Sequence, residues 1–491
     1  MTRIAVFGLG RSGLAVGRAA LARGMDATVY DEAVVPGKPE LLEEARSLGL
    51  KVVTGWDGKL DETPDSVVIN PAIPKDHPTL LRLSAEGIPL HSEVEFAYSI
   101  SRAPIVAITG TNGKSTTTVM TWLALRACGE DAILCGNIYG SGYDEQPLTD
   151  AALHATEDQV LVAEISSFQL EWVDRFKPVS AGITNITPDH LNRYESFDEY
   201  AATKQRIFAC QGDGDFAVVR ANDPVVRKPG KEAGGYVPRH LRSIAHEAVA
   251  DLPRVLTFGA TSDDARVEEM EFVVFGERLP WASFPMEAVH DRQNAAMAAM
   301  LSYGLLCHKR SPLIEEAISR RTEPVNPYST RKSPVTDAIP IQILDGLRSY
   351  KGLAHRMESV GSRDGIRLVN NSMCTNPDAV VKSTQALKDG AHILMGGVNK
   401  DLDFAPLARY LANRRHRVYL FGQDAGDIAK VLGGDPPIFA SMEEAFAAAV
   451  ASARKGEIVV LSPGCASSDQ FRDFRHRGDA FRDLAKEWLD R

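Results

Sequence analysis

The chain has 491 residues, which is more than one ordinary hydrophobic core needs and predicts two to four domains. Hydrophobic residues make up 44% and charged residues 24%, the profile of a globular protein rather than a disordered one. The formal net charge of −10 argues against nucleic acid as the main partner, because phosphate backbones select basic surfaces.

The first segment, from Met1 to Gly8, holds an apolar run too short for the core of a signal peptide. No stretch approaches the roughly 18 apolar residues that span a bilayer. The six cysteines lie far apart without a CxxC pair, so we expect reduced thiols rather than disulfides or a zinc site. We therefore expect a cytoplasmic monomer without membrane partners.

Short β-rich runs alternate with helical patterns almost throughout the chain, which indicates an α/β fold with parallel sheets. The predicted elements of the first domain are a strand at Ile4–Phe7, a helix at Ser12–Ala22, and strands at Ala27–Tyr30 and Val67–Asn70.

A GxGxxG turn, Gly8 to Gly13, joins the first strand to the first helix. Glycines permit the tight turn, and the free amides of the helix N-terminus attract phosphate. Asp31 ends the second strand, where an acid can accept hydrogen bonds from a ribose or a base. Alone, this pattern suggests a nicotinamide dehydrogenase, or a packing turn without a ligand, and it leaves the nucleotide open.

A second domain opens near residue 103 with the apolar strand Ile105–Ile108, which runs directly into the loop Thr109–Thr116, TGTNGKST. The loop amides can cradle a polyphosphate, Lys114 can neutralise its β and γ phosphates, and the Ser115 hydroxyl can bind Mg²⁺. The loop is shorter than GxxxxGK[ST], because Ile108 stands where the first glycine of that pattern would be.

Three later residues of this domain are candidates for chemistry. Glu164 follows the strand Val160–Ala163, where a carboxylate faces the binding crevice and suits Mg²⁺. His190 follows the strand Ala181–Ile186, and its imidazole can bind a metal or a carboxylate. Lys204 lies on a predicted helix, and nothing in the local composition distinguishes it from a solvated lysine.

From about Arg310 to Ile341 the pattern loosens around five prolines, and we predict a linker or insertion there. A further strand of the second domain is predicted at Phe216–Arg220. A third domain follows the linker. The predicted elements of the third domain are strands at Arg367–Val369, His392–Met395, Arg417–Phe421 and Glu457–Ser462, and a helix at Glu443–Ala453.

Together these segments resemble the Mur ligase family, most closely its glutamate-adding members. The runs TGTNGKST, EISSFQLE, TNITPDHLNRY, AATKQRIF and LSPGCASSDQF occur in the order typical of that family, and the last is characteristic of those members. The resemblance covers nearly the whole chain apart from the segment around 310–341.

The resemblance implies three α/β domains with a linker or insertion at 310–345. They are a Rossmann-like N-terminal domain (1–102) for a UDP-sugar, a central P-loop-type ATPase domain (103–309) and a C-terminal Rossmann-like domain (346–491) for an amino acid. The implied activity is an ATP-dependent, ADP-forming addition of D-glutamate to UDP-N-acetylmuramoyl-L-alanine in peptidoglycan synthesis. ATP and Mg²⁺ at two sites are the implied cofactors.

The resemblance also implies site residues. ATP is expected at Gly110, Thr111, Asn112, Gly113, Lys114, Ser115, Thr116, Asn294, Arg356 and Asn371. The UDP-sugar is expected at Gly10, Arg11, Ser12, Asp31, Asn137 and Ser166, and glutamate at Thr375, Lys400, Ser467 and Phe474. The implied catalytic residues are Lys114, Glu164, His190 and Lys204, and the metal ligands are Ser115, Glu164, His190 and Lys204 carrying a CO₂-derived carbamate.

In the implied reaction, the alanine carboxylate takes the γ-phosphoryl group of ATP and the acyl phosphate then meets the amine of glutamate. We expect the C-terminal domain to close over this centre. Three residues depart from the family pattern: Asp291 replaces an asparagine, Asn371 an aspartate and Met373 a lysine. Losing a cation near polyphosphate predicts altered ATP handling or a changed acceptor.

Alternatives to the D-glutamate ligase remain. They are a related ligase for another amino acid or for L-glutamate, a non-catalytic nucleotide-binding paralogue, and a dehydrogenase. The dehydrogenase explains neither the phosphate loop nor the pairing of Glu164 with His190.

Overall fold

The computed structural model of the chain consists of two compact units. The first contains residues 1–139 and 143–351, and the second contains residues 140–142 and 352–491. The structure describes residues 2–34, 39–190, 193–226, 253–286, 288–319 (the backbone alone for 311–319), 340–385, 387, 389–399 and 402–491.

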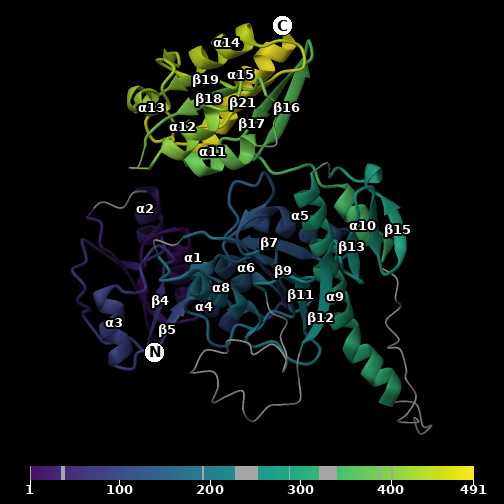
Figure 1. The fold of residues 1–491 in the computed structure, drawn as a ribbon. Helices are drawn as coiled ribbons and strands as arrows, with labels where there is room; N and C mark the ends of the chain where they lie inside the picture. Colours follow the sequence, from purple (N-terminus) through teal and green to yellow (C-terminus); the bar gives the residue numbers. More distant parts are fainter. Residues whose placement is uncertain are drawn as a thin grey trace. The chain divides into compact units, whose positions relative to one another are not determined.

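The first unit begins with a five-stranded parallel sheet in the order β3-β2-β1-β4-β5. Figure 1 shows this part of the chain in purple to blue, with β4 and β5 labelled. Its strands are β1 (Arg3–Phe7), β2 (Asp26–Asp31), β3 (Lys51–Thr54), β4 (Ser66–Ile69) and β5 (Leu90–Ser92). Its helices are α1 (Arg11–Ala22), α2 (Pro39–Ser47), α3 (Pro78–Ala85) and α4 (Glu93–Ile100). The predicted strands correspond to β1, β2 and β4. Because β2 and β4 lie on opposite sides of β1, the glycine turn after β1 lies at the switch point where such sheets bind ligands.

A ten-stranded sheet follows in the order β15-β14-β13-β12-β11-β10-β6-β9-β7-β8. Its strands are β6 (Ile105–Thr109), β7 (Ala132–Gly136), β8 (Glu145–Gln146), β9 (Val160–Glu164), β10 (Ser180–Ile183), β11 (Phe216–Arg220), β12 (Arg254–Gly259), β13 (Ala265–Val267), β14 (Glu271–Val274) and β15 (Glu277–Pro280). Its helices are α5 (Lys114–Ala127), α6 (Leu148–His154), α7 (Ser167–Leu170), α8 (Phe197–Gln205), α9 (Val289–Ser319) and α10 (Ile341–Arg348). Strand β6 is parallel to both of its neighbours, β9 and β10, so the segments after these three strands emerge at one edge.

The outer end of this sheet differs from the parallel arrangement that we expected throughout. Strands β13, β14 and β15 are antiparallel. Phe275 and Gly276, which join β14 to β15, both have positive φ, 47° and 85°. A two-residue hairpin turn of this kind reverses the chain without a crossover helix.

The range predicted to be a linker, 310–345, differs from that expectation at both ends. Helix α9 continues to Ser319, and α10 begins at Ile341, while residues 320–339 lie outside the described residues. In α10 the buried residues Ile343, Leu344 and Leu347 lie on one helical face, and the helix packs against α5. The apolar spacing thus outweighed the neighbouring prolines. The three-domain division itself stays a prediction.

The second unit is built on a six-stranded sheet in the order β16-β17-β21-β18-β19-β20, parallel except for the β16–β17 pair. Its strands are β16 (Glu358–Arg363), β17 (Ile366–Asn370), β18 (His392–Gly396), β19 (Arg417–Phe421), β20 (Ile438–Phe439) and β21 (Ile458–Leu461). Its helices are α11 (Pro377–Thr384), α12 (Ala405–Leu411), α13 (Ala425–Leu432), α14 (Met442–Ser452) and α15 (Phe474–Asp490).

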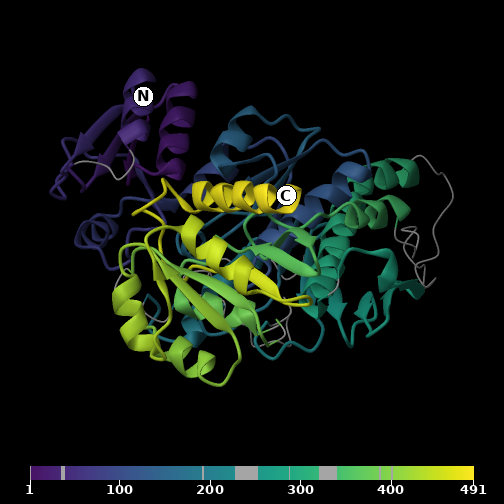
Figure 2. The same ribbon diagram turned by 90° about the horizontal axis from the view of Figure 1, so that it is seen from above.

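Both faces of this second sheet are buried. One core contains residues of α11, α12 and α13, and the other contains residues of α14 and α15. Figure 2 shows α15, in yellow, alongside the strands that it covers. Strands buried on both faces explain the continuous apolar runs Ile393–Met395 and Ile458–Leu461. The predicted α/β fold class is confirmed in both units.

Candidate active site

The phosphate loop lies between β6 and α5, and two of its glycines have backbone conformations that other residues rarely adopt. Gly110 has φ +146° and Gly113 has φ +83°. A Cβ at Gly110 would approach Thr184 Oγ1 to 1.9 Å, and one at Gly113 would approach Asn294 Oδ1 to 2.4 Å. Gly113 is also the N-cap of α5 and has no side chain with which to cap it, so an anion at this helix N-terminus would compete with no capping side chain.

The segment after β10 holds this loop in place. The amide of Thr111 donates to Asn185 O at 2.8 Å, and the amide of Asn112 donates to Asn185 Oδ1 at 3.1 Å. Thr184 Oγ1 donates in return to Asn112 O at 2.7 Å. Thr111 and Asn112, both predicted to bind ATP, therefore use their amides to shape the loop. The amides from Gly113 onward are the better candidates for phosphate.

Glu164 ends β9 beside the loop strand and is 3% exposed. Its Oε1 accepts a hydrogen bond of 3.0 Å from Asn137 Nδ2, so the structure brings a predicted metal ligand and a predicted substrate contact together. Its Oε2 is buried without a hydrogen-bond partner among the described residues. A buried carboxylate oxygen with no donor is costly unless a cation or a ligand meets it.

Lys204, for which the local sequence favoured a solvated side chain, is 2% exposed. Its Nζ donates to Gly110 O at 2.8 Å and lies 4.8 Å from the centre of the Tyr200 ring. Burial, aided by the nearby charge of Lys114, lowers the pKa of Lys204 to about 7. A large share of this amine is therefore neutral near neutral pH, the form that reacts with CO₂.

His190 has φ 54°, and its ring centre lies 4.8 Å from that of Phe168. Burial lowers the pKa of the imidazole, which favours the neutral form that a metal needs. Among the described residues, no group of three His, Cys, Asp or Glu side chains is arranged to hold a metal. Glu164 Oε2 is thus the feature of the site that fits Mg²⁺ best.

Tyr200 is a site residue that the sequence analysis missed. It is 1% exposed, and its hydroxyl lies 3.1 Å from Thr111 Oγ1. It precedes Lys204 by one helical turn, so both side chains lie on the same face of α8. This spacing of one helical turn from Lys204 is the feature of the sequence that could have pointed to Tyr200.

In the N-terminal sheet, Asp31 braces the glycine turn. Asp31 Oδ2 accepts from the amide of Leu9 at 2.7 Å, and Oδ1 accepts from the amide of Ala33 at 2.9 Å. A Cβ at Gly13 would lie 2.1 Å from Gly8 O, so this glycine permits close helix packing. The Arg11 guanidinium lies 4.2 Å from the centre of the Tyr139 ring. Asp31 thus has a structural role besides the predicted contact to the sugar nucleotide.

Ser166, another predicted substrate contact, is the N-cap of α7 and forms a capping box with Gln169. Its hydroxyl accepts from the amide of Gln169 at 3.2 Å. The capping contacts of this short helix therefore hold Ser166 in place, two residues after Glu164 in the chain.

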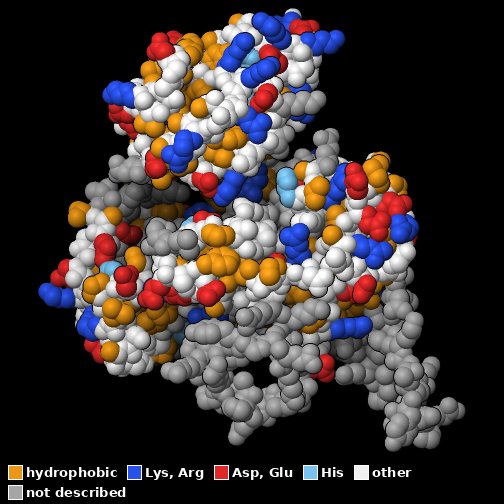
Figure 3. Space-filling model, viewed as in Figure 1, with side chains coloured by type: hydrophobic (Ala, Val, Ile, Leu, Met, Phe, Trp, Pro, Cys, Tyr) orange, Lys and Arg blue, Asp and Glu red, His pale blue; other side chains and the backbone are white. Residues whose placement is uncertain are grey.

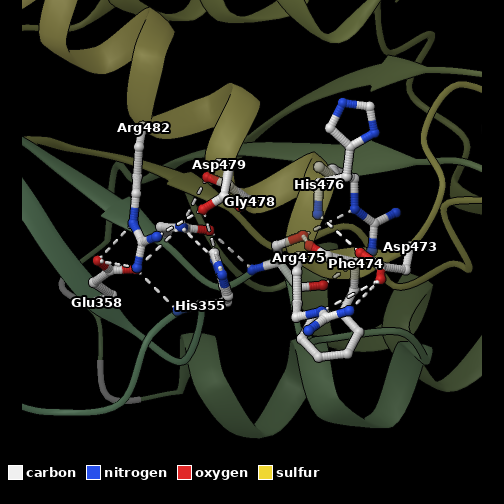
Figure 4. Close-up of polar contacts among 12 residues, drawn as sticks. His355, Glu358, Asp473, Phe474, Arg475, His476, Gly478, Asp479 and Arg482 are labelled. Carbon is white, nitrogen blue, oxygen red and sulfur yellow. Dashed lines mark hydrogen bonds and ion pairs between the residues drawn. The ribbon is translucent and has the colours of Figure 1, made fainter. Parts of the chain in front are cut away.

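In the second unit, Arg477 holds together the segments that contain the predicted glutamate contacts. This arginine is fully buried, and its guanidinium donates to Ser372 O, Ser372 Oγ and Cys465 O at 3.0–3.1 Å. Ser372 Oγ also donates to Phe474 O at 2.7 Å. Figure 4 shows Phe474 at the start of α15. The segments near Thr375, Ser467 and Phe474 are thereby joined. Lys400 lies outside the described residues.

The two predicted ATP contacts of the second unit have partners within it. Asn371 is buried, donates from Nδ2 to Ser462 Oγ at 3.1 Å and accepts from the amide of Met357 at 3.2 Å. Arg356 Nη2 lies 3.5 Å from Met373 Sδ. Met373, which replaces a family lysine, thus lies directly beside Arg356, the cation of this unit that is predicted to contact ATP.

In Figure 3, acidic, basic and hydrophobic side chains are interspersed over the visible face of each unit. No helix in the described part of the chain is both long and apolar enough to cross a bilayer.

Three family models match successive parts of the chain. They are described as Mur ligase MurD-like, N-terminal domain (residues 2–92), Mur ligase middle domain (108–301) and Mur ligase, glutamate ligase domain (355–465). The UDP-N-acetylmuramoylalanine–D-glutamate ligase of Pelotomaculum thermopropionicum is 34% identical over 494 residues, which cover 98% of this chain and 97% of that protein. The ligase of the same name from Myxococcus xanthus is 32% identical, covering 99% and 98%.

A solved structure shows the same fold. The UDP-N-acetylmuramate-alanine ligase of Thermotoga maritima aligns with a TM-score of 0.54 at 17% identity, covering 99% of this chain and 100% of that one.

Proposed function

The chain belongs to the Mur ligase family, and from that premise we propose that it joins D-glutamate to UDP-N-acetylmuramoyl-L-alanine with conversion of ATP to ADP and phosphate. This is an amide-bond-forming step of peptidoglycan precursor synthesis in the cytoplasm. The observation that carries the proposal is the end-to-end likeness to D-glutamate ligases, 34% identity with 97% of the relative covered.

The proposed reaction has two steps. An oxygen of the alanine carboxylate attacks the γ-phosphorus of ATP, the bond to the β-phosphate oxygen breaks, and ADP leaves. The amine of D-glutamate then attacks the acyl phosphate carbon, phosphate leaves, and the amine loses a proton as the amide forms. Both steps depend on holding charged groups in line, because the transferring phosphoryl group offers little other chemistry to a protein.

The residues of the first unit support the phosphoryl transfer. The amides at the start of α5 and the ammonium of Lys114 meet the phosphate oxygens, where they stabilise the charge of the transition state. Lys114 Nζ donates to Thr111 O at 2.9 Å, which holds its side chain against the loop. The contacts of Asn185 keep the loop in this shape.

Ser115, Glu164, His190 and a carbamylated Lys204 would hold Mg²⁺, which when bound neutralises phosphate charge. Among the described residues, Glu164 Oε2 has no hydrogen-bond partner, and this supports the assignment. The carbamate forms when the neutral amine of Lys204 adds to the carbon of CO₂ and releases one proton to solvent, which leaves an anionic oxygen ligand. Lys204 Nζ donates to Gly110 O in the phosphate loop, so a carbamate on Lys204 would place its oxygens beside that loop.

The remaining assignments concern the two substrates. Gly10, Arg11, Ser12, Asp31, Asn137 and Ser166 would contact the UDP-sugar, and Thr375, Lys400, Ser467 and Phe474 would contact glutamate. Asn294, Arg356 and Asn371 would contact ATP.

Phosphate release in a coupled assay tests the proposal. Purified protein receives ATP, Mg²⁺ and UDP-N-acetylmuramoyl-L-alanine with D-glutamate, L-glutamate or no amino acid, and the product is identified by mass spectrometry. We expect the wild-type protein to release phosphate and form the dipeptide product with D-glutamate, but not with L-glutamate or without an amino acid. A Lys114→Met variant should give neither phosphate nor product. Equal phosphate release without an amino acid, or product with L-glutamate only, would overturn the proposal.

A further inference from the structure

A carboxylate outside the proposed catalytic residues is buried at the first residue of α4. Glu93 is 2% exposed, and both of its oxygens accept hydrogen bonds. Oε1 accepts from the amide and the hydroxyl of Thr149, at 2.8 and 2.9 Å, and Oε2 accepts from Gln169 Nε2 at 3.1 Å. Glu93 thus joins the first turn of α4 to α6 and α7, with which α4 packs.

The contact to Gln169 continues to Ser166. Gln169 Oε1 accepts from the amide and from the hydroxyl of Ser166, both at 2.9 Å. The hydroxyl oxygen of Ser166 in turn accepts from the amide of Gln169. An unbroken chain of hydrogen bonds therefore leads from Glu93 through the side-chain amide of Gln169 to the backbone N–H and the hydroxyl of Ser166.

This chain has a direction that the carboxylate imposes. An ionised carboxylate can only accept, so the amide of Gln169 must turn its NH₂ group toward Glu93 and its oxygen toward Ser166. If the amide were reversed, its NH₂ group would face the N–H of Ser166, two donors against each other. Burial raises the pKa of Glu93 above its usual range, and the donors from Thr149 and Gln169 oppose this rise by stabilising the ionised form.

We propose that Glu93 is a positioning residue for the UDP-muramoyl substrate, acting through Gln169 to fix the backbone and hydroxyl of Ser166. The proposal rests on the proposed function, which puts Ser166 at that substrate. Ser166 lies two residues from Glu164, whose side chain holds Asn137, so the segment that Glu93 orders connects to two of the substrate contacts.

The first test is Glu93→Gln, which keeps the size and removes the charge. Its amide cannot satisfy Thr149 and Gln169 together, because one NH₂ group must face another donor. We expect calorimetry to show about tenfold weaker binding of UDP-N-acetylmuramoyl-L-alanine, roughly 1.4 kcal/mol. KM for that substrate should rise by a similar factor, with kcat and the KM for ATP within about twofold of wild type, which a general loss of structure would not produce.

The second test exchanges the two side chains, Glu93→Gln with Gln169→Glu. In this double variant the oxygen of the new glutamine accepts from Thr149 and its NH₂ group donates to the new glutamate. That glutamate accepts from Ser166, so every hydrogen bond and the net charge are kept. We expect substrate affinity within about twofold of wild type. Gln169→Glu alone sets two carboxylates face to face and should bind as weakly as Glu93→Gln.

Glu95→Gln is the matched control from the same helix. Glu95 is also 2% exposed, and it accepts from the amides of Asp174, Arg175 and Phe176, with no link to Ser166. This variant should lower the melting temperature while leaving substrate affinity unchanged.

The outcomes separate the two proposals. Wild-type protein that does not bind UDP-N-acetylmuramoyl-L-alanine overturns the proposed function. If wild type binds, the positioning role is overturned by Glu93→Gln binding equally well, by Glu95→Gln binding as weakly as Glu93→Gln, or by an exchange variant that does not recover.

Discussion

Lys204 Nζ donates a hydrogen bond of 2.8 Å to the carbonyl oxygen of Gly110, 94 positions earlier in the chain. This contact attaches α8 to the phosphate loop and removes the lysine from solvent. Burial is the main reason why the pKa of Lys204 falls to about 7. A lysine that the local sequence does not distinguish is thereby brought to the centre of the proposed chemistry.

Lys204→Met should lower kcat on the order of a hundredfold or more, because methionine fills the site but cannot become a carbamate. With ¹³C-bicarbonate, wild-type protein should show a carbamate carbon signal by NMR that the variant lacks. Lys204→Arg is the charge-retaining control and should be equally inactive. An active Lys204→Met variant would falsify the carbamate assignment.

Gly113→Ala should weaken ATP binding on the order of a hundredfold, about 2–3 kcal/mol, measured by calorimetry. The added Cβ would lie 2.4 Å from Asn294 Oδ1 at a φ of +83°, which distorts the loop where the amides of α5 begin. Gly129→Ala is the matched control, since Gly129 has φ +86° with nothing within 4 Å. It should cost roughly 1–2 kcal/mol of folding stability and leave ATP binding intact. Equal ATP affinities for the two variants would contradict this account.

Met373→Lys should raise ATPase and ligase activity by restoring the cation that the family pattern has at this position. Because Arg356 Nη2 lies 3.5 Å from Met373 Sδ, the new ammonium would face a guanidinium and should lower the melting temperature without nucleotide. ATP should reverse part of that loss, which differential scanning calorimetry with and without ATP would show. Met373→Leu is the neutral control. A lysine variant with unchanged KM for ATP and unchanged kcat would count against a phosphate-facing role.

His355 should make the folded protein more sensitive to acid. Burial lowers the pKa of His355, and its Nδ1 accepts from Asn370 Nδ2 at 3.0 Å, a contact that a proton on Nδ1 would remove. As the pH falls, His355 therefore takes up a proton near pH 6.5 in the unfolded chain and only at lower pH in the folded chain. The contribution of His355 to the free energy of unfolding is thus present above pH 6.5 and is lost as the pH falls below it.

The measurement is the free energy of unfolding between pH 7.5 and 5 for wild type and His355→Asn. Asparagine keeps an acceptor near the position of Nδ1 and tolerates the φ of 58° at this residue. We expect the wild-type curve to fall more steeply below pH 6.5, by up to about 1.4 kcal/mol per pH unit. Parallel curves would rule out a contribution from His355.

Much of the fold could be read from the sequence, because strands buried on both faces are written as continuous apolar runs. The runs Ile105–Ile108, Phe216–Arg220 and Arg417–Phe421 all correspond to observed strands. The short strands β3 and β5 were missed, since they have few apolar residues and depend on neighbours for their pairing. The hairpin β14–β15 was missed because its turn, Phe275-Gly276, is not a typical turn sequence.

The sequence by itself determined the phosphate loop, because its glycines, lysine and hydroxyls lie within one short run and act through the backbone and side chains of that run. It also determined the family, through motifs that keep their order along the chain. Only the tertiary structure decided that Asn185 takes the amides of Thr111 and Asn112, that Lys204 is buried, and that Glu93 reaches Ser166 through Gln169. The contacts of Asn185, Glu93 and Lys204 join residues 73, 76 and 94 positions apart. Burial and hydrogen-bond partners are properties of the packed chain, which no local pattern of residues contains.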